Sequence, residues 1–300
     1  QWSRGSVGAA VDKGYMKGYE DGTFRPKNNI SRAEAATMLS NALGTILSQS
    51  GTYSGLYDGN VTLTSSNVTL KDAVISGDLY ITEGMGTGYA NLDNVTVLGE
   101  VIVCGGGEGR WGGNSVEFKN CTIQKLTVDG PDDRPVSLYA TGNTTIAQTN
   151  VKSDAYLQNH ADTVPGFDNI RLIGPEDTNL YLSGNFKRVD VINPKNNVTV
   201  GKGEVAMLTV DEDAAESTVQ LDRGVVVKTL NVDGKTKVKG KGDIEQLVVT
   251  TNDSTIEQLP DQIQIRPGAT AEVNGKDMTS MDAEESSTSP RITAGYPKAK

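Results

Sequence analysis

Short apolar triplets with a polar middle residue recur from about residue 61 onward. Their outer residues are apolar and the middle one is often polar, the period-two alternation of a strand with one buried face. Those triplets begin at Val68, Leu79, Val95, Val101, Val116, Leu126, Ile170, Leu180, Val189, Val198, Val219, Leu230, Leu247 and Ile263. No helical segment of useful length separates them, so the pattern predicts a mainly β region over about residues 55–275.

A longer repeat is superimposed on the triplets. An Asn precedes a strand at several places, and the spacing of roughly 17 to 28 residues is typical of solenoids. The Asn positions are Asn94, Asn120, Asn143, Asn169 and Asn197. We therefore predict a parallel β-helix, in preference to leucine-rich repeats or a sandwich. Inward Val, Ile and Leu side chains would stack in columns, each contributing ~1.5–3 kcal/mol. Irregular spacing would be absorbed at corners, for which we expect 105–114, 129–135, 159–166 and 175–179.

The first 48 residues follow a helical pattern. A short helix is predicted near residues 4–16, ended by Gly14. A second is predicted from Ser31 to Leu47, where Ser31 and Glu34 form a capping box. Its apolar stripe is spaced for a helix and comprises Ala35, Met38, Leu39, Ala42, Leu43 and Ile46. Residues 48–54 read as a linker.

An uncapped β-helix would expose unpaired backbone groups on its terminal coil. The second helix lies just before the first coil and has more apolar surface than it can bury alone. We therefore expect this helix, or the segment just after it, to cover the first coil. The alternative is an independent anchor on a flexible linker.

The string Gly18-Tyr19-Glu20-Asp21-Gly22-Thr23-Phe24-Arg25-Pro26, followed by Ile30-Ser31-Arg32-Ala33-Glu34, resembles the S-layer homology (SLH) motif. Asp21-Gly22 forms a turn dipeptide in it. The resemblance implies a secreted protein held on the cell wall of a Gram-positive-type bacterium. Its implied partner is secondary cell wall polysaccharide, with self-association in a surface layer. The implied glycan-binding residues are Trp2, Asp21, Gly22 and Arg32, where the fork of Arg32 suits a carboxylate.

The motif's usual opening is absent, so we expect one incomplete motif in a piece of a longer protein. The β-helix region has repeated Asn-Val-Thr-Val and Gly-Asp-Leu-Tyr-Ile-type coils and a Gly-Gly-Gly loop after a strand. In these features it resembles the pectate-lyase-like right-handed β-helices that accompany SLH motifs in bacterial surface proteins. We assign 1–48 to the motif, 49–278 to the β-helix and 279–300 to a flexible tail.

Composition and charge limit the classes of partner that the protein can bind. A formal net charge of −10 argues against nucleic acid. No apolar run approaches the ~20 residues that span a bilayer. Cys104 and Cys121 flank a glycine-rich loop, so a disulfide is conceivable, although we favour two free thiols.

Candidate chemistry is sparse. Arg110 and Trp111 follow a triple-glycine loop, where the indole could stack on a sugar. Calcium could bind the acidic loops Asp129/Asp132/Asp133 and Asp211/Glu212/Asp213, although we expect solvated corners. Asn-x-Ser/Thr triplets begin at Asn60, Asn67, Asn94, Asn120, Asn143 and Asn197. We interpret them as corner residues and ladders rather than glycosylation sites.

No acid–base constellation can be assembled from the sequence, and His160 alone does not support a serine-type triad. We therefore expect no catalytic residues and no cofactor, and a structural or adhesive β-helix. The alternative is a wall-anchored lyase or glycosidase. Convergence of Asp, Glu, Lys and Arg from successive coils in one groove would discriminate between them.

Overall fold

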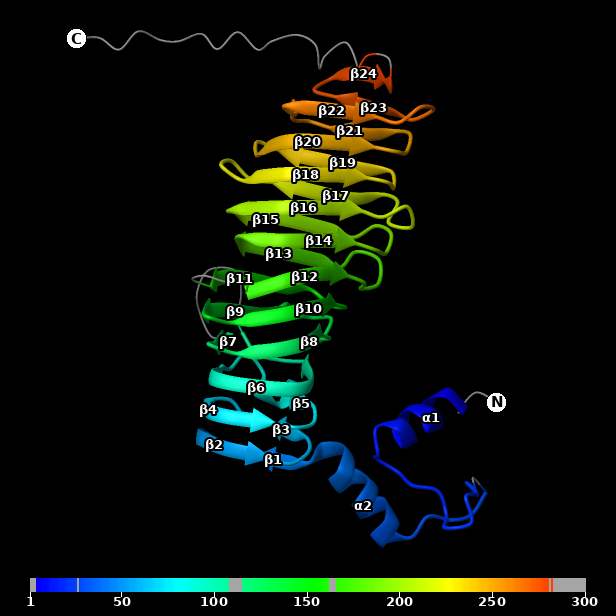
Figure 1. The fold of residues 1–300 in the computed structure, drawn as a ribbon, viewed down its shortest axis with the longest axis vertical. Helices are drawn as coiled ribbons and strands as arrows, with labels where there is room; N and C mark the ends of the chain where they lie inside the picture. The colour runs from blue at the N-terminus through cyan, green and yellow to red at the C-terminus, as the bar shows by residue number, and fades with distance from the viewer. Residues whose placement is uncertain (1–3, 26, 108–114, 162–165, 281, 283–300) are drawn as a thin grey trace, which may run out of the picture. The chain divides into compact units, whose positions relative to one another are not determined.

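The computed structural model describes residues 4–25, 27–107, 115–161, 166–280 and 282. The fold is mainly β: a parallel β-solenoid of about 11 turns with two short N-terminal helices. The chain divides into two compact units, one ending at Asp168 and the other beginning at Asn169. Figure 1 shows the stacked strands in each unit and the helices before β1. The solenoid predicted from the triplets is confirmed, while its right-handed sense stays a prediction.

In the first unit, the helices are α1 (Arg4–Asp12), α2 (Arg32–Leu43) and the 3-10 helix η1 (Glu83–Met85). Its strands are β1 (Thr45–Leu47), β2 (Gly51–Tyr57), β3 (Val61–Leu63), β4 (Val68–Ile75), β5 (Leu79–Ile81), β6 (Ala90–Val103), β7 (Val116–Lys119), β8 (Thr122–Val128), β9 (Val136–Gly142), β10 (Thr145–Val151) and β11 (Ala155–Ala161).

These strands stack in two parallel series. One series runs β1–β3–β5–β6–β8–β10, and the other runs β2–β4–β6–β7–β9–β11. Strand β6 is long enough to serve both, because its first half pairs with β4 and its last residues pair with β5. Each turn of the chain thus adds one strand to each series.

The second unit contains β13 (Asn179–Gly184), β14 (Phe186–Val191), β15 (Asn197–Lys202), β16 (Glu204–Val210), β17 (Ser217–Leu221), β18 (Val226–Val232), β19 (Thr236–Gly240), β20 (Asp243–Val249), β21 (Ser254–Ile256), β22 (Gln262–Ile265), β23 (Thr270–Val273) and β24 (Lys276–Thr279). Strand β12 (Gly166–Leu172) spans the division between the units. The series β14–β16–β18–β20–β22 and β13–β15–β17–β19–β21–β23 are parallel. Strand β24 turns back antiparallel to β23.

The core is a set of aliphatic columns. In the second unit Val189, Leu208, Leu230 and Leu247 occupy one register position and are each 0% exposed. In the first unit the outer residues of the β5 triplet, Leu79 and Ile81, are likewise 0% exposed. In a parallel, in-register stack, paired residues of neighbouring strands point their side chains to the same face. The inward residues of successive strands therefore form a column.

A second buried column in the second unit is polar. Thr178 donates its amide to Asn196 Oδ1 (3.0 Å), and Asn196 donates its own to Ser217 Oγ (3.1 Å). Further along, the Thr236 amide donates to Ser254 Oγ (3.1 Å). These side chains are at most 4% exposed. They supply acceptors for corner amides in a buried site, and the Thr178 amide also donates to the Pro175 carbonyl (3.4 Å).

The predicted asparagine corners are confirmed in part. Asn67, Asn94 and Asn120 adopt left-handed φ angles of 62°, 57° and 53°. At Asn143, the preceding Gly142 takes the positive φ, and Asn143 donates its amide to Asn120 Oδ1 (3.0 Å). Asparagine therefore serves both as a corner and as a ladder acceptor.

The predicted corner at 129–135 lies between β8 and β9, as expected. Of the predicted corner at 175–179, residues 175–178 precede β13, which starts at Asn179. The predicted corner at 159–166 is partly strand, because β11 continues to Ala161. Residues 108–114 and 162–165, and most of the tail, lie outside the described residues.

The helices differ from expectation. Helix α1 ends at Asp12, and α2 ends at Leu43, because Gly44 turns the chain with φ 62°. Ile46, which fits a helical stripe by spacing alone, belongs to β1 and is paired with Thr62. Stacking thus begins at Thr45, inside the stretch assigned to the SLH motif.

Helix α2 itself does not cover the first coil, whereas the segment just after it, β1, pairs with β3. The helix has no buried residue, and Leu39 and Leu43 are 62% and 37% exposed. Its capping box is as predicted, but the helix contacts the solenoid through its C-terminal end. Strand β2 also begins at Gly51, so little of residues 48–54 remains a linker.

Candidate functional site

A tight loop after α1 is organised around Asp21. Its Oδ1 accepts hydrogen bonds from Thr23 Oγ1 (2.6 Å) and the Thr23 amide (3.0 Å), and its Oδ2 accepts from Arg25 Nη2 (2.5 Å). The contacts with Thr23, followed by that with Arg25, lower the pKa of the Asp21 carboxyl. Gly22 adopts φ 75° and donates its amide to the Tyr19 carbonyl (2.9 Å). Asp21 and Gly22 therefore shape the loop.

Arg25 and Tyr19 complete this loop. The Arg25 guanidinium lies over the Tyr19 ring at 4.5 Å from the centroid and also donates to Thr23 Oγ1 (3.2 Å). Sequence reasoning missed both residues, although the Asp21/Arg25 spacing of four residues was a usable signal. Tyr19 and Phe24 remain 41% and 42% exposed, so the loop presents aromatic surface to solvent.

Arg32 is the first residue of α2 and is exposed. The nearby Glu34 carboxylate accepts from the Ser31 amide (2.8 Å), while Ser31 Oγ accepts from the Glu34 amide (3.1 Å). Hydrogen bonding to the Ser31 side chain and amide lowers the pKa of Glu34. Among the described residues no carboxylate pairs with Arg32. Its guanidinium fork is thus available for an anionic ligand.

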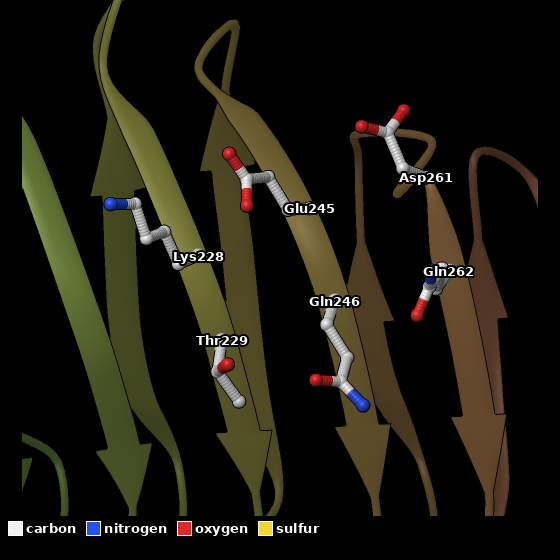
Figure 2. Close-up of a pocket in the computed structure, with 6 residues that line it drawn as sticks. All are labelled: Lys228, Thr229, Glu245, Gln246, Asp261 and Gln262. Atoms are coloured by element: carbon white, nitrogen blue, oxygen red, sulfur yellow. The ribbon is translucent and has the colours of Figure 1, made fainter.

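A second polar surface lies on the outer face of β18, β20 and β22. Lys228, Thr229, Glu245, Gln246, Asp261 and Gln262 line an open groove of about 350 Å³ (Figure 2). The three strands stack in register, so Thr229, Gln246 and Gln262 form one column. Lys228 Nζ lies 2.6 Å from Glu204 Oε1, and this hydrogen bond raises the pKa of Lys228.

Charged residues from successive coils therefore line one groove, in which the Lys228 side chain points away from Glu245 and Asp261 (Figure 2). Its side chains can donate and accept hydrogen bonds toward a hydroxyl-rich ligand. Lys228 is already engaged by Glu204, which leaves amides, a hydroxyl and carboxylates as the principal contacts.

Comparison with known proteins bears on the N-terminal segment. Residues 1–36 match the family model of the S-layer homology domain. The chain carries an SLH domain. No curated protein matches this chain. Among solved structures, it is similar to chitinase ChiW from Paenibacillus sp. str. FPU-7, a bacterial cell-surface-expressed multi-modular enzyme machinery. That similarity has 27% identity and a TM-score of 0.48, and it covers 53% of this chain and 14% of the chitinase chain.

The SLH domain indicates a cell-surface, cell-wall-associated protein, since SLH domains bind cell-wall polymers and imply wall anchoring. The matched residues contain α1, the Asp21 loop and the first turn of α2. Among the helices that the structure describes, none is long and apolar enough to cross a membrane.

The residues predicted for glycan binding are only partly brought together. Asp21 and Gly22 share the loop network, whereas Arg32 lies outside that network at the start of α2. Trp2, Arg110 and Trp111 lie outside the described residues, so their roles stay predictions.

The acidic loops are held by ordinary contacts. Asp129 pairs with Lys152 (3.3 Å), Asp133 lies 3.5 Å from Arg134, and Asp211 Oδ1 accepts from the Asp213 amide (3.3 Å). Within the part of the chain that the structure describes, no group of three or more His, Cys, Asp or Glu is arranged to hold a metal ion.

Cys104 and Cys121 are free thiols, as favoured from the sequence. Burial raises the pKa of both, that of Cys121 to about 11, so Cys121 stays protonated at neutral pH. His160 lies against the Tyr139 ring, with centroids 5.0 Å apart. The register of β9 and β11, rather than any local motif, brings these two rings together.

Proposed function

We propose that this protein is anchored to the cell wall by binding of its SLH domain to secondary cell wall polysaccharide, and that Arg32 contacts an acidic group of the glycan. The observation that carries this proposal is that the Arg32 guanidinium, at the start of α2, pairs with no carboxylate of the residues that the structure describes. The Asp21 loop would act by fixing the shape of the neighbouring surface, because its carboxylate is already engaged by Thr23 and Arg25.

The solenoid would serve as a structural or adhesive extension. Its columns of fully buried Val, Ile and Leu give the coils of each unit their own core. Its outer polar groove offers hydrogen-bonding groups for adhesion, and contact between copies in a surface layer would use the same kind of surface.

A second candidate is a wall-anchored polysaccharide-degrading enzyme. The observation that favours it is that Glu245, Asp261 and Lys228 line one groove, since glycoside hydrolysis commonly uses two carboxylates. We prefer the extension role because the groove is open and Lys228 is paired with Glu204. Incubating the protein with wall glycans and uronate-containing polysaccharides, and measuring their depolymerisation, tests for this enzyme activity. Depolymerisation that survives repurification and is lost in Glu245→Gln would replace the extension role.

Wall binding is tested by sedimentation with wall preparations that retain or lack their attached polysaccharide. We expect binding only to the former, and Arg32→Ala should weaken it by ~1.5–3 kcal/mol, the loss of one charge-assisted contact. Arg4→Ala is the matched control, because Arg4 is also the first residue of an exposed helix. Equal binding by the two variants would contradict the role of Arg32, and equal binding to stripped wall would contradict the polysaccharide as ligand.

A further inference from the structure

The first turns of the solenoid carry a short polar ladder on successive coils. Asn60 Oδ1 accepts from the Asp78 amide (2.8 Å), and Asp78 Oδ1 accepts from the Glu100 amide (2.9 Å). Gly77 precedes Asp78, and Gly99 precedes Glu100. A Cβ at Gly77 would lie 2.4 Å from Asn60 Oδ1, and a Cβ at Gly99 would lie 2.5 Å from Asp78 Oδ1. The ladder therefore uses Oδ1 of Asn60 and Oδ1 of Asp78. Asn60 Nδ2 and Asp78 Oδ2 remain for other partners.

The remaining amide group of Asn60 holds the end of α2. Asn60 Nδ2 donates to the carbonyls of Ala42 (2.8 Å) and Asn41 (3.4 Å), and the buried Thr62 Oγ1 donates to the carbonyl of Leu43 (2.6 Å). The last carbonyls of a helix lack intrahelical partners and carry partial negative charge, so side-chain donors stabilise them. Here the donors come from the solenoid, about 18 residues further along the chain.

The remaining carboxylate oxygen of Asp78 holds the segment after α1. Asp78 Oδ2 accepts from Lys13 Nζ (2.6 Å), Tyr80 Oη (3.1 Å) and Tyr15 Oη (3.3 Å), and the two hydroxyls lie 2.6 Å apart. The Asp78 side chain is only 15% exposed. Burial opposes its ionisation, yet the Glu100 amide, Lys13 and Tyr80 together lower its pKa.

We propose that two polar sites on the first coils form a seat that fixes the SLH domain on the first unit of the solenoid as one rigid body. At one site, Asn60 and Thr62 bind the end of α2. At the other, Asp78 and Tyr80 bind Lys13 and Tyr15. One hydrogen bond alone would permit rotation about it, whereas several hydrogen bonds at each of two sites restrict that rotation. The two ends of the gripped segment are Lys13 and Leu43, so the Asp21 loop and Arg32 lie between the fixed points.

The seat gives the solenoid a role in anchoring. A wall anchor on a flexible linker would leave the solenoid free to tumble, whereas a seated anchor sets the direction of its first coils from the wall. Gly44 supports this close approach, because a Cβ there would lie 1.9 Å from the Asn60 carbonyl oxygen. The proposal concerns geometry within this chain and holds whatever polymer the SLH domain binds.

The test is a distance distribution measured between spin labels at Ala9→Cys in α1 and Lys71→Cys in β4, with Cys104 and Cys121 replaced by Ala. Both label sites are exposed. We expect one narrow distribution in the parent chain and loss of that narrow peak in Lys13→Met and in Asp78→Asn. The double variant should be no broader than either single one, because both remove the same contact. Lys17→Met is the matched control and should keep the narrow peak.

Two outcomes would overturn the proposal: a broad distribution in the parent chain, or a peak in Lys13→Met as narrow as that in Lys17→Met. Lys13 lies outside the solenoid, so its substitution leaves every ladder bond between the coils in place. The Lys13→Met comparison therefore decides the matter even if Asp78→Asn disturbs folding.

Discussion

The SLH domain and the solenoid are stabilised in opposite ways. Neither α1 nor α2 has a buried residue, whereas column residues such as Leu208 and Leu230 in the second unit are 0% exposed. The Asp21 loop is held by the Asp21 carboxylate, which accepts three hydrogen bonds. Helix α2 is held by its capping box and by the hydrogen bonds that Asn60 donates. The difference teaches that the coils carry their own core, while the SLH domain depends on polar contacts that the solenoid partly supplies.

The largest expected effect breaks a column. Leu230→Ala should destabilise the chain by about 2–5 kcal/mol, because it removes buried contacts and leaves a cavity. The matched substitution Leu39→Ala, at a residue 62% exposed in α2, should change stability by no more than about 0.5 kcal/mol. Urea denaturation followed by circular dichroism measures both. Similar midpoints for the two variants would refute the contrast.

The next effect concerns the buried polar column. Asn196→Ala should cost about 1–3 kcal/mol, because the buried Thr178 amide would lose its 3.0 Å hydrogen bond and keep only the longer one to the Pro175 carbonyl (3.4 Å). Asn29→Ala, at an exposed position of the SLH segment, is the control and should behave like the parent chain in the same urea experiment. If Asn196→Ala matched the control, water would have to replace the lost acceptor, and the column would not be needed for stability.

A smaller effect is expected at the cap of α2. Ser31→Ala removes the acceptor for the Glu34 amide and should destabilise the helix by about 1 kcal/mol. Amide hydrogen exchange should therefore accelerate in α2 and stay unchanged in β14–β22. Faster exchange in those strands as well would show that the cap and the solenoid core unfold together.

The smallest effect is the response of the seat to pH. The folded-state pKa of Asp78 is below its ordinary value of 3.8, so its contribution is present above that pH and is lost as pH falls through the lowered value. The pKa of Lys13 is raised above 10.5, chiefly by its hydrogen bond to Asp78, so its contribution persists until pH rises through that raised value. Tyr15, Tyr80 and the Glu100 amide are the other groups facing this carboxylate.

The label distance should thus stay narrow from about pH 5 to pH 9 and broaden only as pH falls below 3.8, through the lowered pKa of Asp78. Asp78→Asn should show no such acid transition. A peak that stays unchanged as pH is lowered below 3.8 until the chain unfolds would mean that the Asp78–Lys13 contact does not hold the segment.

The coils could be predicted from sequence because their signal is local. In Leu79-Tyr80-Ile81 the alternation alone decides which side chains are buried, and stacking repeats that choice in every turn. The Ser31/Glu34 capping box is local too, and it was found. In contrast, Ile46 satisfies both a helical stripe and a strand, so spacing could not place it, although Gly44 marked the end of the helix.

The seat could not be predicted, because Lys13 and Asp78 are 65 residues apart and no pattern links them. Asn60 was interpreted as a corner residue, and its second role at the end of α2 depends on where the chain returns in space. The groove at Lys228 and Glu245 arises in the same way, from the register of β18 and β20.

The most direct measurement is hydrogen exchange of the intact chain with and without purified secondary cell wall polysaccharide. The account predicts added protection between residues 19 and 34, where the Asp21 loop and Arg32 lie, and no change in the slowly exchanging strands β14–β22. Unchanged exchange between residues 19 and 34, or protection confined to the solenoid, would contradict anchoring through the SLH domain.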